Sequence, residues 1–319
     1  MNRQSHGGAL LAVLWLSAAL AAIAFSLAVT VRAETARSST AADGVRAYYL
    51  ALGGIERAIQ WMLWAQIRNP DNSPRYWTHG QPRLVFDFPS GVTEVEIIPE
   101  ASKLNLNAIP AQELNLLLLN LGVEPDRAAL ITQAVVDWRS PAPGGLSPFD
   151  AFYLASRPSF RARHASFEET EELLLVRGMT PEIYHGSYVR DAAGKLIAYG
   201  GLKHCISVYG STGAVDVNTA HPALLRTLGI SPEVVERLII RRRALPFRNQ
   251  QELVDFAQTA GPGFQRLMVG GVVMYTLRAH ARLKTPAGLS DLVRSAALLI
   301  RFNGPDEDLP FHRLRWYDY

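Results

Sequence analysis

Cysteine is nearly absent from this chain of 319 residues, which contains only Cys205. A single thiol excludes an intramolecular disulfide, and it leaves no cysteine pair for a zinc site. Cys205 lies in the apolar stretch HCISVYG, which predicts a buried structural thiol and not a reactive one. Because cysteine pairing gives no information on the cellular compartment, location has to be inferred from the N-terminus.

Motifs for common catalytic sites are also absent. The eight histidines are His6, His79, His164, His185, His204, His221, His280 and His312. They are dispersed, without an HExxH pattern or a close pair that would support a zinc site. The acidic residues Glu168, Glu169, Glu171 and Glu172 are spaced as at a solvated helix N-terminus, which differs from a paired acid and base. The sequence therefore predicts no catalytic residues, no cofactor and no enzymatic activity.

A strong excess of one charge is missing as well. The formal net charge is +3, from 32 basic and 29 acidic residues. This balance gives no global field that would favour nucleic acid or an acidic substrate. The length exceeds that of a typical single domain and predicts two or three lobes.

Charged residues are absent from position 7 to position 31. Residues 9–31 match the length that a helix needs to cross a bilayer core of about 30 Å. Arg3 precedes this segment and Arg32 follows it, so basic residues orient it only weakly, and the short leading segment favours a cytoplasmic N-terminus. The chain after Arg32 is then expected outside the cytoplasm.

A cleaved secretory signal is the main alternative for this segment. Two features oppose it: the apolar run is longer than a usual signal core, and apolar residues continue at helical spacing toward Arg68. These residues are Val45, Tyr49, Leu52, Ile55, Ile59 and Met62. Residues 38–44 are small and polar and form a weak point. The pattern still favours one long helix, apolar in its first half and amphipathic in its second.

The rest of the chain has strand-forming ends and a helical middle. Residues 84–88, 92–98, 272–283, 292–302 and 311–319 are predicted strands, separated by turn-forming residues. Residues 111–266 carry mainly helical periodicity, with an extended interruption at residues 204–209. The predicted fold class is therefore α+β. One antiparallel sheet is expected to pack on the long helix, with the helical region inserted between its second and third strands.

One pattern occurs twice in the helical region, beginning at Lys103 and again at Ala214. Each copy has a short extended piece ending in asparagine, a helix, a Leu-Gly turn and a second helix. Gly122 and Gly229 are expected to make the turns between the helices, because glycine adopts the required backbone angles without strain. Residues 175–184 form a third, shorter example. Such pairs of short helices form small modules that bury each other's faces.

Helix-capping signals accompany the second copy. Asn218 or Thr219 is placed to cap the helix that starts near Pro222. Ser231 followed by Pro232 is a favoured way to begin the next helix.

Helix pairs joined by glycine turns also occur in DNA-binding helix-hairpin-helix modules, and arginines 241–243 follow the second pair. A membrane-anchored DNA-binding protein of an uptake system is therefore the alternative function. Such hairpins usually have a second glycine at a position where this chain has Glu124, Ser231 and Thr180. Glu124 would repel a phosphate, and arginines at a helix C-terminus also complement the helix dipole. The sequence favours a protein that does not bind nucleic acid.

Glycines directly before the apolar run resemble the leader of type IV pilins and type II secretion pseudopilins. The residues concerned are Arg3, Gly7, Gly8 and the string ALLAVLWLSAALAAIA, which begins at Ala9. This resemblance implies that a prepilin peptidase cleaves after Gly7 or Gly8 and leaves the membrane span on the mature protein. Major subunits of these families carry a glutamate near the start of the mature helix, where this chain has Ala12 and Val13. A missing glutamate is characteristic of the K-type minor subunit.

The phrases LNLNAIP, VVDW, SFEETEELLLVRGMTPEIY, VDVNTAHPALLRTLG and IIRRRALPFRNQQEL, in this order, resemble the minor pseudopilin K (GspK) family of type II secretion systems. The resemblance implies a leader at residues 1–8, a membrane span at 9–31 and a pilin-like core at 32–102 and 267–319. It also implies an inserted all-helical domain at residues 103–266, built from two SAM-like modules.

The family further implies a location and partners. The chain would be a single-pass protein of the bacterial inner membrane with its C-terminal domain in the periplasm. It would cap the pseudopilus tip with the I-type and J-type minor pseudopilins, beside other inner-membrane components, and support protein export across the outer membrane.

Members of this family can bind calcium in the inserted domain through acidic residues that follow the VVDW-like helix. In this chain Asp137 is followed by Arg139, Ser140 and the uncharged stretch PAPGGLSP before Asp150. Calcium takes 6 to 8 oxygen ligands, and few carboxylates are available here. The sequence therefore argues against calcium, although the resemblance allows it.

Overall fold

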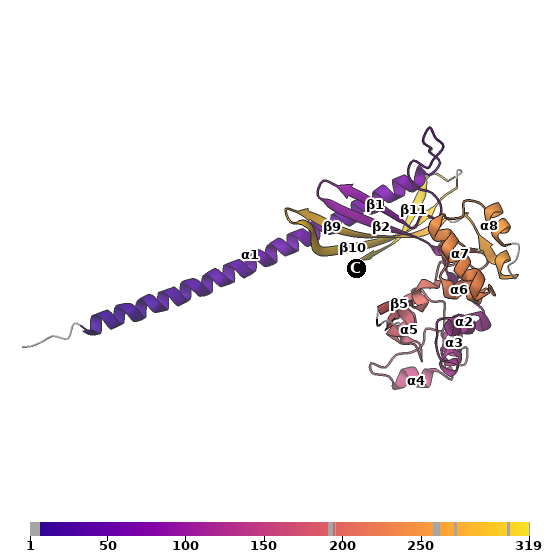
Figure 1. Ribbon diagram of the computed structural model, residues 1–319. Coiled ribbons are helices and arrows are strands. Elements are labelled where there is room, and N and C mark those ends of the chain that lie inside the picture. The colour runs from indigo at the N-terminus through magenta and orange to yellow at the C-terminus, as the bar shows by residue number, and fades with distance from the viewer. Residues whose placement is uncertain are drawn as a thin grey trace, which may run out of the picture.

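The computed structural model describes residues 7–190, 194, 196–257, 262–270, 273–304 and 307–318. A single helix, α1 (Gly7–Leu63), leads into a globular part in which its C-terminal third packs on a sheet (Figure 1). At 1.5 Å per residue, this helix is about 85 Å long. The predicted continuous helix is confirmed. It ends at Leu63, and Arg68 instead bridges to Pro74 in the loop that follows.

The helix continues through the predicted weak point at residues 38–44. Thr40 directs its hydroxyl to the carbonyl of Ala36 at 2.9 Å, so a small polar side chain bonds its own helix and does not break it. Gly44 is buried, and the Arg294 side chain lies over it. A Cβ built at this position would lie 3.1 Å from the Arg294 guanidinium. The globular part therefore begins to cover α1 at Gly44.

Five antiparallel strands form the sheet in the order β1-β2-β9-β10-β11 (Figure 1). The strands are β1 (Arg83–Phe88), β2 (Gly91–Pro99), β9 (Met274–Thr285), β10 (Gly288–Phe302) and β11 (Phe311–Asp318). All five correspond to strands predicted from the sequence. The insertion lies between β2 and β9, as expected, and these two strands pair directly, so its two ends leave and rejoin the sheet at neighbouring strands.

Small residues line the contact between α1 and the sheet. Ala47, Ala51, Gly54 and Ala58 are buried on the helix. They face a sheet surface that includes Ala279, Ala281 and Ala296, and these three strand alanines belong to one core cluster with the three helix alanines. Small side chains on both sides let the helix backbone come close to the strands.

This contact corrects the predicted amphipathic face. Ile55, Ile59 and Met62 are buried as expected, but Val45 is 56% and Tyr49 66% exposed. The larger side chains at the start of this region lie outside the contact because alanines occupy the side of α1 that touches the sheet. Hydrophobic periodicity identified the helix, but it could not identify a face built from small residues.

Seven α-helices are described in the insertion. They are α2 (Ala111–Asn120), α3 (Pro125–Arg139), α4 (Asp150–Ala155), α5 (Pro181–His185), α6 (Pro222–Thr227), α7 (Pro232–Ala244) and α8 (Gln250–Ala257). Short 3-10 helices join them at η1 (Glu100–Ser102), η2 (Thr170–Leu175), η3 (Leu202–His204) and η4 (Pro262–Arg266). The acidic run at residues 168–172 therefore precedes and enters a 3-10 helix.

The expectation of an all-helical insertion is wrong. A hairpin of β4 (Gly186–Arg190) and β5 (Leu196–Gly200) projects from it. Two short parallel pairs join β3 (Leu104–Asn105) to β6 (Ile206–Ser207) and β7 (Val215–Asp216) to β8 (Leu267–Met268). Because β8 pairs with β7, the insertion extends past the boundary expected at residue 266. These pairings join segments that are distant in sequence, which local periodicity does not detect.

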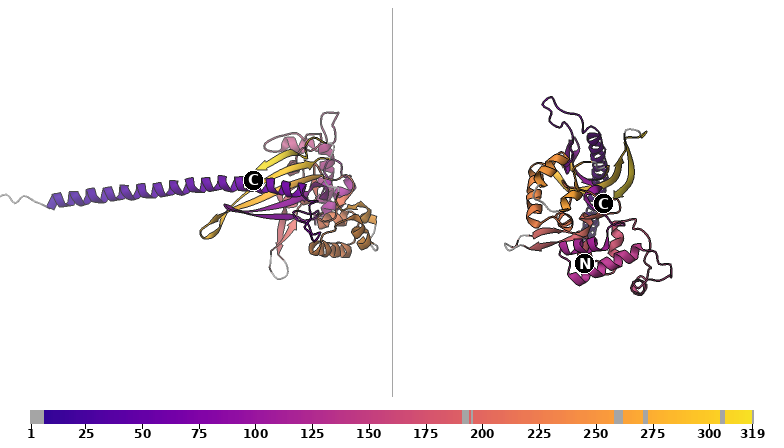
Figure 2. Two further views of the ribbon diagram at one scale, coloured as in Figure 1. Left: turned by 90° about the horizontal axis from the view of Figure 1, so that it is seen from above. Right: turned by 90° about the vertical axis from the view of Figure 1, so that its right-hand side faces the viewer.

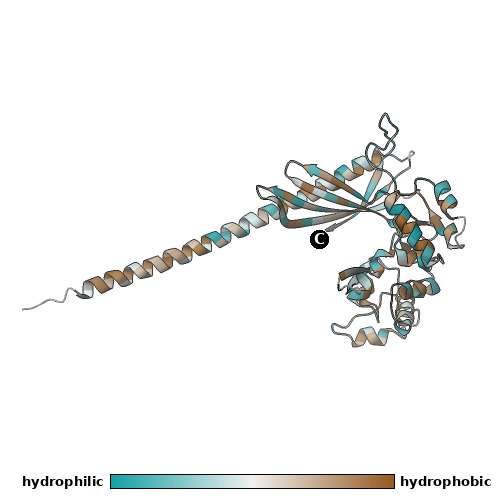
Figure 3. Cartoon of the chain, viewed as in Figure 1, coloured by the Kyte–Doolittle hydropathy of each residue, from teal (hydrophilic) through white to brown (hydrophobic). Residues whose placement is uncertain are grey.

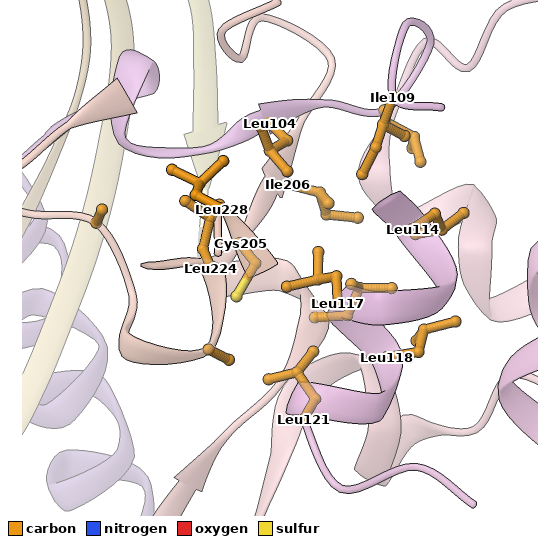
Figure 4. Close-up of a cluster of buried hydrophobic side chains, with 14 of the residues drawn as sticks. Leu104, Ile109, Leu114, Leu117, Leu118, Leu121, Cys205, Ile206, Leu224 and Leu228 are labelled. Atoms are coloured by element: carbon orange, nitrogen blue, oxygen red, sulfur yellow. The ribbon is translucent and has the colours of Figure 1, made fainter. Parts of the chain in front are cut away.

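The insertion has its own apolar core, in which α2 and α6 pack together (Figure 4). Cys205 is completely buried in this core, and burial raises the pKa of its thiol to about 12. The prediction of a buried structural thiol is confirmed. Figures 1 and 2 show that the insertion lies at the end of the sheet away from the free half of α1 and extends beyond the sheet sideways.

Candidate functional site

The N-terminal half of α1 is bare. Its large apolar side chains have no partner among the described residues, and Trp15 and Phe25 are 74% and 73% exposed. Figure 3 shows this half as a nearly continuous hydrophobic rod. Among the described residues, α1 is the one helix long and apolar enough to cross a membrane. Exposing so much apolar surface to water is strongly unfavourable, so this half needs a lipid or protein environment.

The residues predicted for processing lie at the start of this rod. Gly7 is the first residue of α1, Gly8 is exposed, and Ala9 belongs to the same helix. Ala12 and Val13, at the position of the absent glutamate, are also exposed. The first carboxylate on α1 is Glu34, beyond the apolar run. Residues 1–6, including Arg3, lie outside the described residues.

The two sequence repeats have matching backbone clamps. In the first, Asn107 accepts a hydrogen bond from the backbone nitrogen of Phe167 at 2.7 Å and donates one to its carbonyl at 3.0 Å. In the second, Asn218 does the same with the buried Phe247, at 2.8 and 2.9 Å. Each asparagine thereby fixes a distant loop whose phenylalanine enters the core. The sequence repeat therefore corresponds to a repeat in the structure.

An arginine completes each clamp. Arg139 at the end of α3 donates to the carbonyls of Leu106 at 2.6 Å and Ile109 at 2.5 Å. Arg242 near the end of α7 donates to the equivalent carbonyls of Val217 and Ala220, both at 2.8 Å. Both arginines satisfy carbonyls of the extended piece that precedes the first helix of their module.

The glycine turns are confirmed. Gly122, Gly178 and Gly229 have φ values of 79°, 88° and 85°, in the left-handed region that favours glycine. Ser231 and Pro232 begin α7 as predicted.

The predicted cap of α6 is wrong. The N-cap is His221, whose Nδ1 accepts a hydrogen bond from Ala223 at 3.3 Å. Asn218 is engaged with Phe247, and Thr219 donates to Asp216. A tertiary contact therefore takes the side chains that local spacing assigned to the cap.

Two of the three arginines at 241–243 are directed inward. Arg242 forms the clamp described above, and burial lowers the pKa of its guanidinium to about 10. Arg241 lies over the Phe247 ring at 5.1 Å and contacts Glu252 at 3.5 Å. Of the three, only Arg243 is exposed. This arrangement does not favour the DNA-binding alternative, because the arginine run presents no continuous basic surface to a phosphate backbone.

Comparisons with known proteins agree with this architecture. A family model described as "Type II secretion system (T2SS), protein K" matches residues 100–186. The type II secretion system protein K of Klebsiella pneumoniae is 27% identical over 248 residues, covering 72% of this chain and 71% of that protein. The protein of the same description from Pectobacterium carotovorum subsp. carotovorum is 30% identical over 204 residues, covering 58% of this chain and 61% of that protein.

A solved structure has the same fold. A chain in the crystal structure of the GspK-GspI-GspJ complex from enterotoxigenic Escherichia coli superposes with a TM-score of 0.56 and 18% identity, covering 89% of this chain and 99% of that chain. This chain therefore resembles type II secretion system protein K in sequence and in fold. The resemblance inferred from the ordered phrases is thereby confirmed, as is the pilin-like arrangement of a long helix on an antiparallel sheet.

Members of the protein K family are minor pseudopilins, which are structural subunits and not enzymes. The titratable groups of this chain fit a structural role. His204 and His221, distant in sequence, stack with centroids 6.3 Å apart. Burial, together with nearby cations, lowers the pKa of both rings to about 4, so both are neutral at physiological pH. Among the described residues, no three His, Cys, Asp or Glu side chains gather to hold a metal.

The acidic run at residues 168–172 also has a structural role. Glu172 accepts hydrogen bonds from the backbone nitrogens of Glu168 and Glu169 at 2.7 and 3.0 Å. Glu169 pairs with Arg315 of β11 and so ties η2 to the sheet. The predicted helix N-terminus is present, but these carboxylates serve as caps and tertiary contacts in addition to facing solvent.

A cleft of about 810 Å³ separates the sheet from the insertion. Its walls carry both charges, including Arg278 and Glu96 on the sheet side and Lys203 and Glu171 on the insertion side. No single ligand charge is favoured by this lining. The cleft marks the boundary between the sheet lobe and the insertion.

Proposed function

We propose that this chain is the minor pseudopilin that caps the pseudopilus tip, in complex with I-type and J-type minor pseudopilins, and that it supports protein export across the outer membrane. The observation that carries the proposal is the bare apolar half of α1 joined to a compact core with a wide insertion at the far end. The apolar half of α1 can pack among the helices of other subunits. The insertion widens the end of the molecule that would face outward. The similarity to protein K and the complex formed by the Escherichia coli relative support the same assembly.

The proposal includes a location. Residues 9–31 would span the bacterial inner membrane once, with the N-terminus in the cytoplasm and the globular part in the periplasm. The length of the uncharged run and the exposure of its side chains support this placement. Between residue 31 and Gly44, the exposed helix would hold the globular part about 20 Å from the membrane surface.

The processing site is proposed at Gly7 or Gly8. In cells that contain prepilin peptidase, mass spectrometry of the purified chain should show the loss of seven or eight N-terminal residues. A strain without the peptidase should yield the uncut chain, because the apolar run is too long for an ordinary signal peptide. Cleavage beyond Ala24 in either strain would contradict the proposed membrane anchor.

The absence of a glutamate near the start of the mature helix is proposed to fit a subunit that caps the end of the pseudopilus. A carboxylate near the mature N-terminus is thought to pair with a neighbouring subunit's amino group, and Ala12 and Val13 cannot make that pairing. A subunit that lacks this group needs no neighbour above it. The exposure of both side chains on a bare helix supports a role for this surface in packing and not in charge pairing.

The insertion is proposed to consist of two SAM-like modules that enforce the end position by steric exclusion. The matched asparagine and arginine clamps support two related modules. The sideways extension of the insertion beyond the sheet supports steric exclusion, because a subunit stacked above it would overlap this volume.

Complex formation tests the function directly. Tagged full-length chain, coexpressed with cognate I-type and J-type subunits and prepilin peptidase, should purify from detergent as a stable complex of all three. The matched control replaces the I-type and J-type subunits with the major pseudopilin, which should not form an equally stable complex. Recovery of this chain alone beside soluble, processed partners would refute the proposed assembly.

A further inference from the structure

The His164 ring lies between the end of α3 and the start of α4, where every polar neighbour of its nitrogens is a hydrogen-bond acceptor. Nδ1 is 3.3 Å from the carbonyl oxygen of Asp137 and 3.2 Å from that of Ser140. Nε2 is 3.0 Å from Oδ2 of Asp150. A neutral imidazole has one N–H, so one nitrogen would direct its lone pair at oxygen lone pairs. Only the doubly protonated ring satisfies both sides.

We propose that His164 is held as an imidazolium, and that this ring is the resident cation of the acceptor cluster formed by Asp137, Ser140 and Asp150. It crosslinks the end of α3, the start of α4 and the segment that leads to η2. This part of the insertion therefore needs no divalent metal.

Apart from His164, the carboxylate of Asp150 is stabilised by uncharged backbone groups of Ser147 and Ala162. The Asp150 side chain is 1% exposed, and its Oδ2 also accepts a hydrogen bond from the backbone nitrogen of Ser147 at 2.8 Å. Leaving a buried carboxylate without a countercharge is costly. The imidazolium of His164, whose side chain is 15% exposed, supplies that charge at hydrogen-bond distance.

The other charged groups around the ring are engaged elsewhere. The Asp137 carboxylate accepts from the Ser147 hydroxyl at 2.8 Å. Arg163, next in the chain to His164, pairs with Glu168 and Glu172. On α4, the Tyr153 hydroxyl accepts from the backbone nitrogen of Arg177.

The Arg177 guanidinium lies over the rings of Phe149 and Phe152 at 5.9 and 5.1 Å. In the described part of the chain, Asp150 is thus the one ionised side chain in hydrogen-bond contact with the His164 ring.

The backbone conformation of His164 is a second indication that the contacts of its ring hold this residue in place. Its φ is 50°, in the left-handed region that non-glycine residues adopt at a cost. A residue is held there only when its surroundings compensate for that cost. The three contacts of the ring are the compensation visible at this position.

Calcium, which the family resemblance allows, does not fit this cluster. The two carbonyls and Oδ2 of Asp150 already face the ring, and Oδ1 of Asp150 is the remaining buried oxygen of that side chain without a partner. Calcium requires 6 to 8 oxygen ligands, and the imidazole occupies the space between those that exist.

The direction of the pKa shifts agrees with the geometry and sets the pH dependence. Burial by itself lowers the pKa of His164, but the hydrogen bond and the charge of Asp150 outweigh it, and the net pKa is raised. A raised folded-state pKa contributes stability that is complete below the unfolded value of about 6.5 and is lost as pH rises through the folded value. The insertion should therefore loosen on the alkaline side.

Nuclear magnetic resonance of the full-length chain in detergent, labelled with ¹⁵N-histidine, tests the protonation state. The His164 signals, identified by their loss in His164→Gln, should show both ring nitrogens protonated at pH 7. Their titration midpoint should lie above the ordinary histidine value of about 6.5. The matched control is His312→Gln, which removes an exposed histidine of β11 and should leave the His164 signals unchanged. A neutral ring at pH 7 would overturn the proposal.

Two measurements on the wild-type chain do not depend on a variant. Hydrogen exchange, corrected for intrinsic rates, should show residues 137–164 losing protection as pH rises through the His164 midpoint, while residues 214–244 keep theirs. The melting temperature should be the same in millimolar CaCl2 and in EGTA. If the exchange pattern does not change across that midpoint, the proposal that the His164 imidazolium is the cation of this cluster is contradicted. A clear rise of the melting temperature in calcium would contradict it as well.

Discussion

Replacing Arg242 with alanine should destabilise the insertion by roughly 2–6 kcal/mol, because it leaves two carbonyls without donors at about 1–3 kcal/mol each. Arg242 is the donor to Val217 and Ala220, and it also lies near the buried carboxylate of Asp216, whose pKa is raised by burial. Chemical unfolding of the full chain in detergent measures the loss. Hydrogen exchange should place the opening in residues 214–230.

The neighbouring arginine is the matched control. Arg243 is exposed, and Arg243→Ala should change stability by no more than about 0.5 kcal/mol. Arg242→Lys keeps the charge, but its single ammonium group cannot reproduce the forked geometry of the guanidinium and should give an intermediate loss. Equal effects of the two alanine variants would show that the clamp on the second module is not what stabilises it.

Gly54→Ala should destabilise the contact between α1 and the sheet by about 1–3 kcal/mol, the usual cost of overpacking. A Cβ at this position would lie 2.3 Å from Cγ2 of Thr93. Thr93 is completely buried, and its hydroxyl donates to the carbonyl of Leu50 at 3.2 Å, so its side chain has little freedom to move. Thermal unfolding in detergent, followed by circular dichroism, measures the effect.

The adjacent glycine should respond in the opposite direction. Gly53 is exposed on the same helix, and a Cβ there meets nothing within 4 Å. Gly53→Ala should therefore stabilise the protein by about 0.5–1 kcal/mol through helix propensity alone. If both substitutions stabilise the chain, α1 does not lie as close to β2 as the structure has it.

The sequence predicts the first half of α1 better than the second, and the reason is physical. The uncharged run before Arg32 needs no tertiary partner to be recognised, because length and composition alone match a bilayer. The second half was recognised as helical, but its buried face was misassigned at Val45 and Tyr49. A face of alanine and glycine carries little hydrophobic signal, although it permits the closest approach.

The insertion likewise has some features that the sequence predicts and others that it does not. The glycine turns were predictable because a sharp turn between helices requires backbone angles that glycine adopts without strain. The clamp by Asn218 was not, since its partner Phe247 is 29 residues further along the chain and local spacing suggested a helix cap. The β4 and β5 hairpin was missed because its surroundings carry mainly helical periodicity.

The sequence by itself determined the class of this protein: an uncharged N-terminal run, five strand-forming segments and an ordered series of family phrases around a duplicated helical pattern. These features are local, and local composition and periodicity encode them. Only the tertiary structure decided which side of α1 is buried, that the paired asparagines and arginines hold distant loops, and that His164 faces three acceptors. Those contacts join residues far apart in the chain, and their energies depend on distances that no sequence pattern contains.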